Sequence, residues 1–583
     1  MTAGKSSKNF RILLATVAIL TLAAFGMLIV FNGIAGGYDP NFHMARIHTL
    51  ANNLRAFHFP NPIGLEYLGG MGYGVGFFYG NYWLYPFAIL TLIGIPLTIS
   101  YKLLLVILAA ASMLSIAYTI KSLTKNNFAA LASMPLYVLN NYFISAAFGR
   151  AAIGELFAFV FIPLALLFTL KIINGAGEGV GETAVKNEHN ALKLGLVMAG
   201  LLVGHLLSFV LVLVTMILLL LLNAPRLFKN PRRLLDVLQA GLIGGGLSAV
   251  FLFPLVEQFL TQKFVDTSMD LLGNISLPFS SLNFIQAINP ASMNVLHQGY
   301  VGPIIILLVV VSVLISVVKR TKLNNQYWTI LSVSVFYSIL LYSKPLVAVL
   351  SKNVPAFNTL QSLWRLNVIL IPLYLILISF MFSLLPRKAS FYVMGASALL
   401  VMVNFTFTAK NTLRFVHQRN TVVQVDYENN YGISRGEYLP VEFPKTYPDA
   451  KKVTTASVVA GQEGVELVKN DHHELILRID SDVTTVVIPK VFYKGYVYQV
   501  KADKSGSDWS KALPLEKSDA GLGEVKLTDL NLDAGKKASL IRVKYRQTIP
   551  MWLGWAVTVI TLVALCFLTF IKPNKIKKIR DNS

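Results

Sequence analysis

Long apolar runs follow one another along most of the chain, and they limit its fold more than any other feature. A run of about 20 apolar residues is long enough to cross the hydrocarbon core of a bilayer as a helix. The sequence as a whole is 55% hydrophobic and only 14% charged. These features predict a polytopic α-helical membrane protein. We expect about 12 crossings, at Ile12–Ala35, Tyr101–Ile120, Phe128–Phe148, Ala151–Leu170, Leu192–Gly204, Leu207–Leu222, Leu234–Phe259, Val301–Val318, Tyr327–Leu341, Trp364–Leu385, Phe391–Thr408 and Met551–Ile571.

The basic residues set the expected orientation. The net charge of +22 would suit nucleic-acid binding in a soluble protein, but here Lys and Arg cluster in short loops between apolar runs. Such clustering is the positive-inside pattern. If the interrupted run Tyr82–Ile99 does not cross the membrane, the basic loops after it fall on the cytoplasmic side, as this rule predicts. We therefore expect a cell-membrane protein that contacts lipid and no nucleic acid, with both termini in the cytoplasm. The stretch from Leu192 to Leu222 is short for two crossings, so one tilted helix is an alternative.

The sequence predicts three domains. Residues 1–408 form the multi-helix transmembrane domain, and residues 549–583 form a last crossing with a basic cytoplasmic tail. Residues 409–548 differ, because runs of alternating polarity separated by turn residues are typical of an all-β sandwich. By the number of crossings this sandwich lies outside the cytoplasm. Its expected strands are Thr421–Val425, Glu466–Lys469, Leu475–Ile479, Thr484–Val487, Tyr496–Val500 and Ser539–Tyr545.

A short polar stretch follows the first apolar run and holds an acid and two potential cations. Asp39 precedes Pro40, which suits the first turn of a helix. His43 and Arg46 follow Asp39 by four and seven residues, and therefore lie on the same helix face. The stretch is a candidate site at the lipid–water boundary. The alternative is an Asp that caps the helix beside solvated polar neighbours.

Further ionisable residues fall at the predicted outer ends of helices: Arg150, Glu155, His205 and Arg365, the last preceded by Trp364. Arg150 and Glu155 are five residues apart, so we expect them to reach different neighbours. Each residue has a structural alternative. Arg150 could reach the membrane interface, and Glu155 could stabilise the start of a helix. His205 could be a buried, hydrogen-bonded histidine, and Trp364 with Arg365 could anchor the chain at the interface. Charged groups at membrane depth usually face a cavity or a partner, which makes these residues candidates for substrate binding.

One acid and several cations on one side of a membrane suit a substrate with a lipid anchor and a phosphate. Arginine binds phosphate oxygens through two hydrogen bonds and stays charged near lipid. A carboxylate can accept the proton of an acceptor hydroxyl. This chemistry fits glycosyl transfer from a polyprenyl-phosphate sugar, although a transporter could use similar groups.

Several short motifs also resemble those of a known family. Tyr38–Ile47 resembles the signature HD-x-x-FH-x-x-R-I of bacterial membrane proteins labelled 6-pyruvoyl-tetrahydropterin-synthase-related, a label that implies no pterin chemistry here. Further segments resemble that family and YfhO-type proteins: Gly72-Tyr73-Gly74 with Phe77-Phe78-Tyr79, Gly149-Arg150 with Gly154-Glu155, Leu360–Arg365, Gly436–Pro440 and Ile488–Tyr496. The sequence departs from the pattern at Tyr38, where His is common, and at Ser362-Leu363, where Phe-Pro is usual.

Both groups look like the GT-C glycosyltransferase superfamily. The resemblance implies that Asp39 is the catalytic base, that a polyprenyl-phosphate sugar is the donor, and that Arg46, Arg150 and Arg365 contact its phosphate. Some relatives use a divalent metal, but here no second carboxylate follows Asp39 before Glu66. The isolated acid argues against a metal held by residues of this chain, and a divalent metal as cofactor stays open as an alternative.

Three functions are open at this point. The first is a glycosyltransferase that moves a sugar to a cell-envelope glycopolymer or lipid on the outer face. The second is a transporter or flippase of lipid-linked envelope precursors. The third is a non-catalytic assembly protein of the envelope.

Overall fold

The computed structural model describes residues 2–32, 39–175, 189–265, 282–288, 299–319, 324–419, 433, 436–449, 452–480, 482–502, 508–529 and 538–570. The chain forms two compact units, each assembled from separate stretches. The helical unit comprises Met1–Pro40, Tyr101–Gly244 and Asn274–Val423, and the sheet unit comprises Asn41–Ser100, Gly245–Gly273 and Gln424–Ser583. The predicted strand Thr421–Val425 and the basic tail after Phe570 lie outside the described residues.

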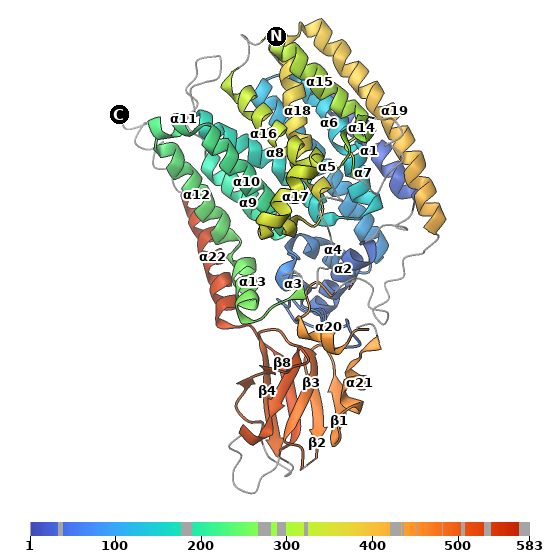
Figure 1. Cartoon of the computed structure of the whole chain (residues 1–583), viewed down its shortest axis with the longest axis vertical. Helices are drawn as coiled ribbons and strands as arrows, with labels where there is room; N and C mark the ends of the chain where they lie inside the picture. The colour runs from blue at the N-terminus through green and yellow to red at the C-terminus, as the bar shows by residue number, and fades with distance from the viewer. Residues whose placement is uncertain are drawn as a thin grey trace. The chain divides into compact units, whose positions relative to one another are not determined.

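The helical unit is a bundle built around one apolar helix, α18 (Asn367–Leu384). Residues 367–382 of α18 are all buried, because α18 has no polar face and needs neighbours on every side. α6, α8, α15 and α16 supply those neighbours (Figure 1). The helices of this unit are α1 (Thr2–Asn32), α5 (Leu97–Thr124), α6 (Asn127–Val138), α7 (Asn141–Ile144), η2 (Ser145–Gly149), α8 (Ile153–Asn174), α9 (Asn190–Gly204), α10 (Leu206–Leu222), α11 (Ala224–Lys229), α12 (Arg232–Leu247), α14 (Phe284–Ile288), α15 (Pro303–Val318), α16 (Asn325–Tyr342), α17 (Lys344–Asn353), η7 (Pro355–Leu360), η8 (Leu363–Leu366), α18 and α19 (Arg387–Arg419).

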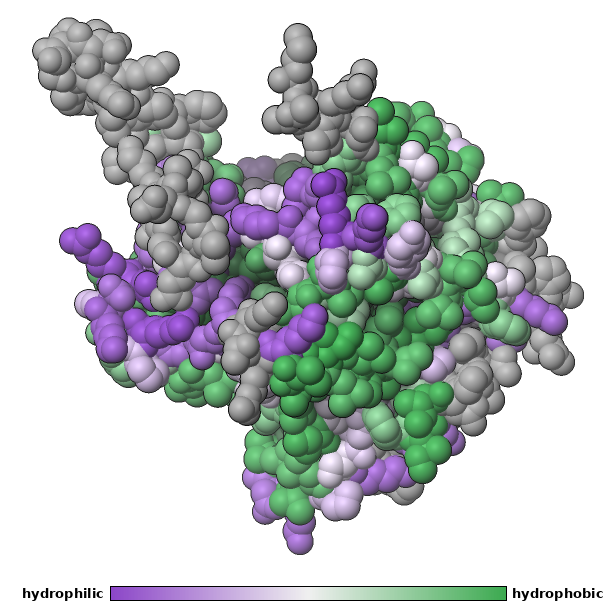
Figure 2. All heavy atoms as spheres, turned by 90° about the horizontal axis from the view of Figure 1, so that it is seen from above, coloured by the Kyte–Doolittle hydropathy of each residue, from purple (hydrophilic) through white to green (hydrophobic). Residues whose placement is uncertain are grey.

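Fewer helices than predicted are long enough to cross a membrane. Within the described residues, six are long and apolar enough, or up to eight if each of two bent pairs is one span. They are Phe10–Val30, Leu97–Thr124, Ile153–Asn174, Leu363–Leu384, Arg387–Thr412 and Ile549–Phe567. The expected 12 crossings are therefore not confirmed. Hydrophobic residues nevertheless cover much of the face seen in Figure 2, with hydrophilic residues gathered in separate patches.

Helix breaks account for the difference, because a broken apolar run leaves pieces shorter than a bilayer needs. Asn140 ends one predicted crossing by capping α7, where its Oδ1 accepts a hydrogen bond of 2.9 Å from the Phe143 amide. His205 has an extended backbone between α9 and α10, which are only 15 and 17 residues long. The chain also breaks at Ser248, between α12 and α13 (Ala249–Thr261). α4 (Tyr85–Leu92) is likewise short, as expected for the interrupted run.

Basic side chains gather at one end of the helical unit. Arg233 donates to the carbonyl of Ile173, and Lys319 donates to the carbonyl of Leu384 at 3.3 Å. These carbonyls belong to the last turns of α8 and α18, where cations are favoured by the helix dipole. The positive-inside rule predicts that this end faces the cytoplasm and that the first turns of α8 and α18 face outward.

The sheet unit contains two antiparallel sheets. The larger has the strand order β1-β2-β8-β4-β5, and the smaller has the order β3-β7-β6. The strands are β1 (Val465–Asn470), β2 (Leu475–Ile479), β3 (Thr485–Val491), β4 (Tyr496–Ala502), β5 (Leu513–Pro514), β6 (Glu516–Lys517), β7 (Leu522–Lys526) and β8 (Ala538–Tyr545). All five expected strands within the described residues are present.

The expectation of an all-β region from residue 409 is wrong in two respects. α19 continues to Arg419 without a break, and two short helices, α20 (Glu442–Thr446) and α21 (Thr455–Ala460), precede the first strand. The sheet unit also includes α2 (Pro40–Arg55), α3 (Val75–Phe78), η1 (Tyr82–Leu84), α4, α13, η10 (Leu527–Asp529) and α22 (Ile549–Phe570). It therefore joins segments from near both ends of the sequence.

Aromatic packing holds the segments of the sheet unit together. Phe78 stacks on Tyr438 with ring centroids 5.2 Å apart, and Phe77 packs against Tyr493 at 5.6 Å. The hydroxyl of Tyr493 donates to the Tyr438 carbonyl at 2.9 Å. A β-carbon on Gly74 would lie 2.6 Å from the Tyr493 ring, so only glycine fits there. Three of the motif segments identified in the sequence thus form one core.

Candidate substrate-binding site

A sharp turn before α8 brings the first two site residues together. η2 is a single π-helical turn, and it ends where the Arg150 amide donates to the Ser145 carbonyl at 2.8 Å. Ala151 then has a φ of 56°, a left-handed conformation that is costly for a residue with a β-carbon. The chain reverses there, and α8 begins at Ile153. Arg150 therefore lies outside the helix and points back along its first turn.

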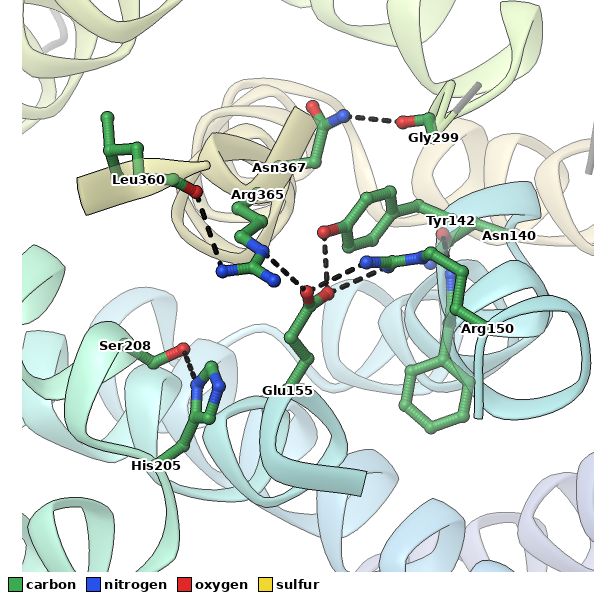
Figure 3. A network of polar contacts seen from close by, with 11 residues as sticks. Asn140, Tyr142, Arg150, Glu155, His205, Ser208, Gly299, Leu360, Arg365 and Asn367 are labelled. Atoms are coloured by element: carbon green, nitrogen blue, oxygen red, sulfur yellow. Dashed lines mark hydrogen bonds and ion pairs between the residues drawn. The ribbon is translucent and has the colours of Figure 1, made fainter. Parts of the chain in front are cut away.

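Arg150 and Glu155 form a two-pronged ion pair in this turn. Nη1 donates to Oε1 and Nη2 donates to Oε2, each at 2.8 Å (Figure 3). The Tyr142 hydroxyl also donates to Oε2, at 2.6 Å. Burial alone would lower the pKa of Arg150, but the facing carboxylate raises it, so the guanidinium stays charged. The expectation that these two residues reach different neighbours is wrong, because helical spacing does not apply to a residue outside the helix.

Arg365 approaches the same carboxylate from a different part of the chain. It lies in η8, directly before α18, and its Nε is 3.6 Å from Oε1 of Glu155 (Figure 3). Its Nη1 donates to the Leu360 carbonyl at 3.4 Å. The Arg365 side chain is 26% exposed, whereas that of Glu155 is 3% exposed. Arg365 is thus the accessible member of the cluster formed by Arg150, Glu155 and Arg365, hereafter the ion cluster.

The ion cluster carries excess positive charge, since two guanidinium groups face one carboxylate. Among the described residues, the Nε atoms of Arg150 and Arg365 are buried without a hydrogen-bond partner. Arginine donors left unsatisfied beside a net positive charge favour an anion with oxygen acceptors. The helical unit has few acids to compete with such an anion: its described acids are Asp39, Glu155 and Asp236.

The backbone of Asp39 is tied to the ion cluster. Its amide donates to the carbonyl of Arg150 at 3.1 Å, and its side chain is exposed. α2 begins at Pro40, as the sequence predicts. Residues just before α2 and just before α8 therefore meet, although more than a hundred positions separate them.

Trp364 and His205 lie in the same unit. A β-carbon on Gly299 would lie 2.6 Å from that of Trp364, and the Asn367 side chain donates to the Gly299 carbonyl at 2.7 Å. These contacts fix the segment that carries Arg365. The His205 ring is half-buried, with its Nδ1 2.7 Å from the Ser208 hydroxyl, and Figure 3 shows it on the Arg365 side of Glu155.

His43 and Arg46 belong to the other unit and are buried there. Arg46 donates to Oδ1 of Asn81 at 2.7 Å and to the Gly80 carbonyl at 2.8 Å, and its guanidinium lies over the Tyr79 ring. Its Nη1 is 3.1 Å from Nδ1 of His43. Burial lowers the pKa of Arg46. These contacts account for both side chains as core groups of the sheet unit, and their role in substrate binding stays a prediction.

Sequence reasoning missed two buried polar groups. Tyr142 completes the hydrogen bonding of Glu155, and the only signal for it was an aromatic residue shortly before the Gly149-Arg150 motif. Lys490 is buried in the sheet unit, where its Nζ donates to the Gly70 carbonyl at 2.6 Å and to Oδ1 of Asn470 at 2.7 Å. No group of three or more His, Cys, Asp or Glu side chains that could hold a metal ion occurs among the residues that the structure describes.

Comparisons with protein-family models and with curated proteins find no match. Among solved structures, the chain is similar to a cryo-EM structure of a mutant of the mycobacterial arabinofuranosyltransferase AftD, with a TM-score of 0.39 and 13% sequence identity. The similarity covers 68% of this chain and 27% of that chain, so the chain spans about a quarter of the length of that protein. A similarity of this size assigns neither fold nor activity.

Proposed function

We propose that this chain is a membrane-integral glycosyltransferase of GT-C type. It would transfer a sugar from a polyprenyl-phosphate donor to a glycopolymer or lipid of the cell envelope, on the outer face of the membrane. The observation that carries the proposal is the ion cluster, which combines net positive charge, unsatisfied buried arginine donors and a direct backbone link to Asp39. The resemblance of Tyr38–Ile47 and Leu360–Arg365 to motifs of GT-C-like proteins also supports it.

In this proposal Asp39 and the ion cluster have separate roles. Asp39 accepts the proton of the acceptor hydroxyl, whose oxygen forms a bond to the anomeric carbon of the sugar. The bond between that carbon and the phosphate oxygen breaks, and polyprenyl phosphate leaves with one additional negative charge. The accessible guanidinium of Arg365 stabilises this charge. Glu155 and Tyr142 do not react, and instead hold Arg150 and Arg365 in position.

A location at the outer face is supported by the distribution of charge within the helical unit. The ion cluster lies at the first turns of α8 and α18, whereas Arg233 and Lys319 cap the last turns of the same helices. The end with the basic caps is the expected cytoplasmic end. Polyprenyl-linked donors would then reach the ion cluster from the outer leaflet of the membrane.

The test is a complementation experiment in a strain that lacks the gene. Asp39→Asn keeps the side-chain size but removes the base, so we expect loss of one envelope glycosidic linkage and accumulation of the lipid-linked sugar. Arg365→Gln should have the same effect. Asp236→Asn is the matched control, because Asp236 is the third described acid of the unit and lies in α12, away from the ion cluster.

Linkage analysis of the envelope glycans and extraction of lipid-linked sugars provide the two readouts, and immunoblots confirm equal membrane levels. An intact linkage pattern in the Asp39→Asn strain rules out the proposed role of Asp39. Transport without a new glycosidic bond, measured with the purified chain in vesicles, would instead favour the flippase alternative.

A further inference from the structure

A second candidate binding site lies at the other end of the helical unit. It is a cavity of about 570 Å³, formed by Phe10 and Leu13 of α1, the α5–α6 turn and the α18–α19 turn. Its apolar lining includes Phe10, Leu131 and Phe382, and its charged lining consists of Lys125 and Arg387. The ion cluster lies at η8, directly before α18, and the cavity lies at the last turn of α18. The two sites are therefore separated by the length of a membrane helix.

Polar contacts between distant segments fix the wall of the cavity. The carbonyl of Phe382 accepts hydrogen bonds from Nδ2 of Asn126 at 3.1 Å and from the Ser390 hydroxyl at 2.9 Å. The other side-chain atom of Asn126, Oδ1, accepts from the amides of Phe128 and Ala129 and caps α6. The α5–α6 turn, α18 and α19 are therefore held together at this point, and the cavity is a built feature of the fold.

Lys125 follows the last residue of α5 and has an unusual backbone conformation. Its φ is 57°, in the left-handed region, and its backbone N–H donates a hydrogen bond of 3.0 Å to the Lys121 carbonyl at the end of α5. Glycine or asparagine usually occupies this position, because a β-carbon is unfavourable there. A lysine at the position sacrifices some stability and directs an exposed ammonium group toward the cavity.

Among the residues that the structure describes, neither cation is paired with an acid. None of the ion pairs among the described residues includes Lys125 or Arg387. Residues 271–425 contain no Asp or Glu at all. Of the described acids of the helical unit, Asp39 and Glu155 lie at the ion cluster, and Asp236 does not line the cavity. The positive charge of the cavity is thus left for an external anion.

We propose that this cavity binds the phosphate headgroup of an anionic membrane lipid. Lys125 and Arg387 would contact the phosphate oxygens, and the apolar lining would cover the glycerol and the first methylene groups of the chains. A free phosphate would contact only the two cations. A lipid would also contact the apolar lining, and the cavity lies at the ends of apolar helices, where lipid headgroups are expected. The site is distinct from the proposed transferase site and does not depend on it.

The test uses the purified full-length chain in detergent. Thermal unfolding is followed while phosphatidylglycerol, phosphatidylcholine or inorganic phosphate is added, and native mass spectrometry counts retained lipids. Lys125→Asn and Arg387→Gln each remove one cation, and asparagine is well suited to the left-handed position, so Lys125→Asn should not unfold the chain. Lys388→Gln is the matched control, because Lys388 is the exposed neighbour of Arg387 and does not line the cavity.

We expect phosphatidylglycerol to raise the unfolding temperature of the natural chain and of Lys388→Gln. Each cavity variant should bind it about fivefold more weakly, as expected for one cation near a phosphate. Equal stabilisation of all variants would overturn the proposal. Equal stabilisation by phosphatidylcholine, or full stabilisation by inorganic phosphate alone, would overturn it as well.

Discussion

Replacing Glu155 with glutamine tests the electrostatics of the ion cluster most directly. The carboxylate accepts two hydrogen bonds of 2.8 Å from Arg150 and one of 2.6 Å from Tyr142, and it is 3.6 Å from Nε of Arg365. The Glu155 side chain is only 3% exposed, and that of Arg150 is 11% exposed. Water therefore cannot replace the lost partner of Arg150, and Glu155→Gln leaves that guanidinium group buried without a counter-charge.

The magnitude follows from the burial of the pair. Removing one partner of a buried ion pair costs about 3–5 kcal/mol, because the other charge stays desolvated. For a large domain this corresponds to a decrease of roughly 10 °C in unfolding temperature. We expect that decrease for Glu155→Gln of the detergent-purified chain, measured by tryptophan fluorescence or calorimetry.

A double variant separates charge from packing. Adding Arg150→Met to Glu155→Gln removes the unpaired buried charge and keeps an acceptor for the Tyr142 hydroxyl. Much of the unfolding temperature should return. Glycan transfer should stay low, because Arg365 has lost the carboxylate that holds it in position. An unchanged unfolding temperature in Glu155→Gln, or no recovery in the double variant, would refute the electrostatic account of this site.

Two further predictions concern the sheet unit. Burial lowers the pKa of Lys490 to about 7, so the unfolded chain binds more protons than the folded chain between pH 7 and the ordinary lysine pKa. The unfolding temperature should therefore increase as the pH rises above 7. Lys490→Met should reduce this dependence on pH. Equal slopes in the natural chain and in Lys490→Met would contradict the lowered pKa of Lys490. Gly74→Ala should lower stability by about 1–3 kcal/mol, because its β-carbon would meet the Tyr493 ring at 2.6 Å. Gly395→Ala, which has open space around it, is the control and should be neutral or slightly stabilising.

The burial of Lys490 shows which features local sequence predicts and which depend on the partner strand. The sequence predicts a strand at Thr484–Val487, which ends before Lys490, whereas β3 continues to Val491. Lys490 also follows Pro489, which cannot donate a ladder hydrogen bond. The pairing of β3 with β7 shifts its register between Ile488 and Val491. Such a bulge redirects the side chains within it, and Lys490 is buried as a result. Only the arrangement of the partner strand determines that shift.

The sequence by itself determined the class of the protein and most of its local elements. Apolar runs predicted membrane helices, alternating polarity predicted the five strands that fall within the described residues, and Pro40 predicted the start of α2. Each of these signals acts over a few neighbouring residues. It did not determine the number of spans, since breaks at Asn140, His205 and Ser248 depend on side-chain caps and bends.

Tertiary structure decided which charged residues form a site. The sequence placed Asp39, His43 and Arg46 on one helix face and separated Arg150 from Glu155. The folded chain instead engages Arg46 inside the sheet unit and pairs Arg150 with Glu155 and Arg365 inside the helical unit. There are two physical reasons. Ala151 has a left-handed backbone, so helical spacing does not relate Arg150 to Glu155. Arg365 reaches Glu155 from the segment directly before α18, and no periodicity within one helix predicts such a contact.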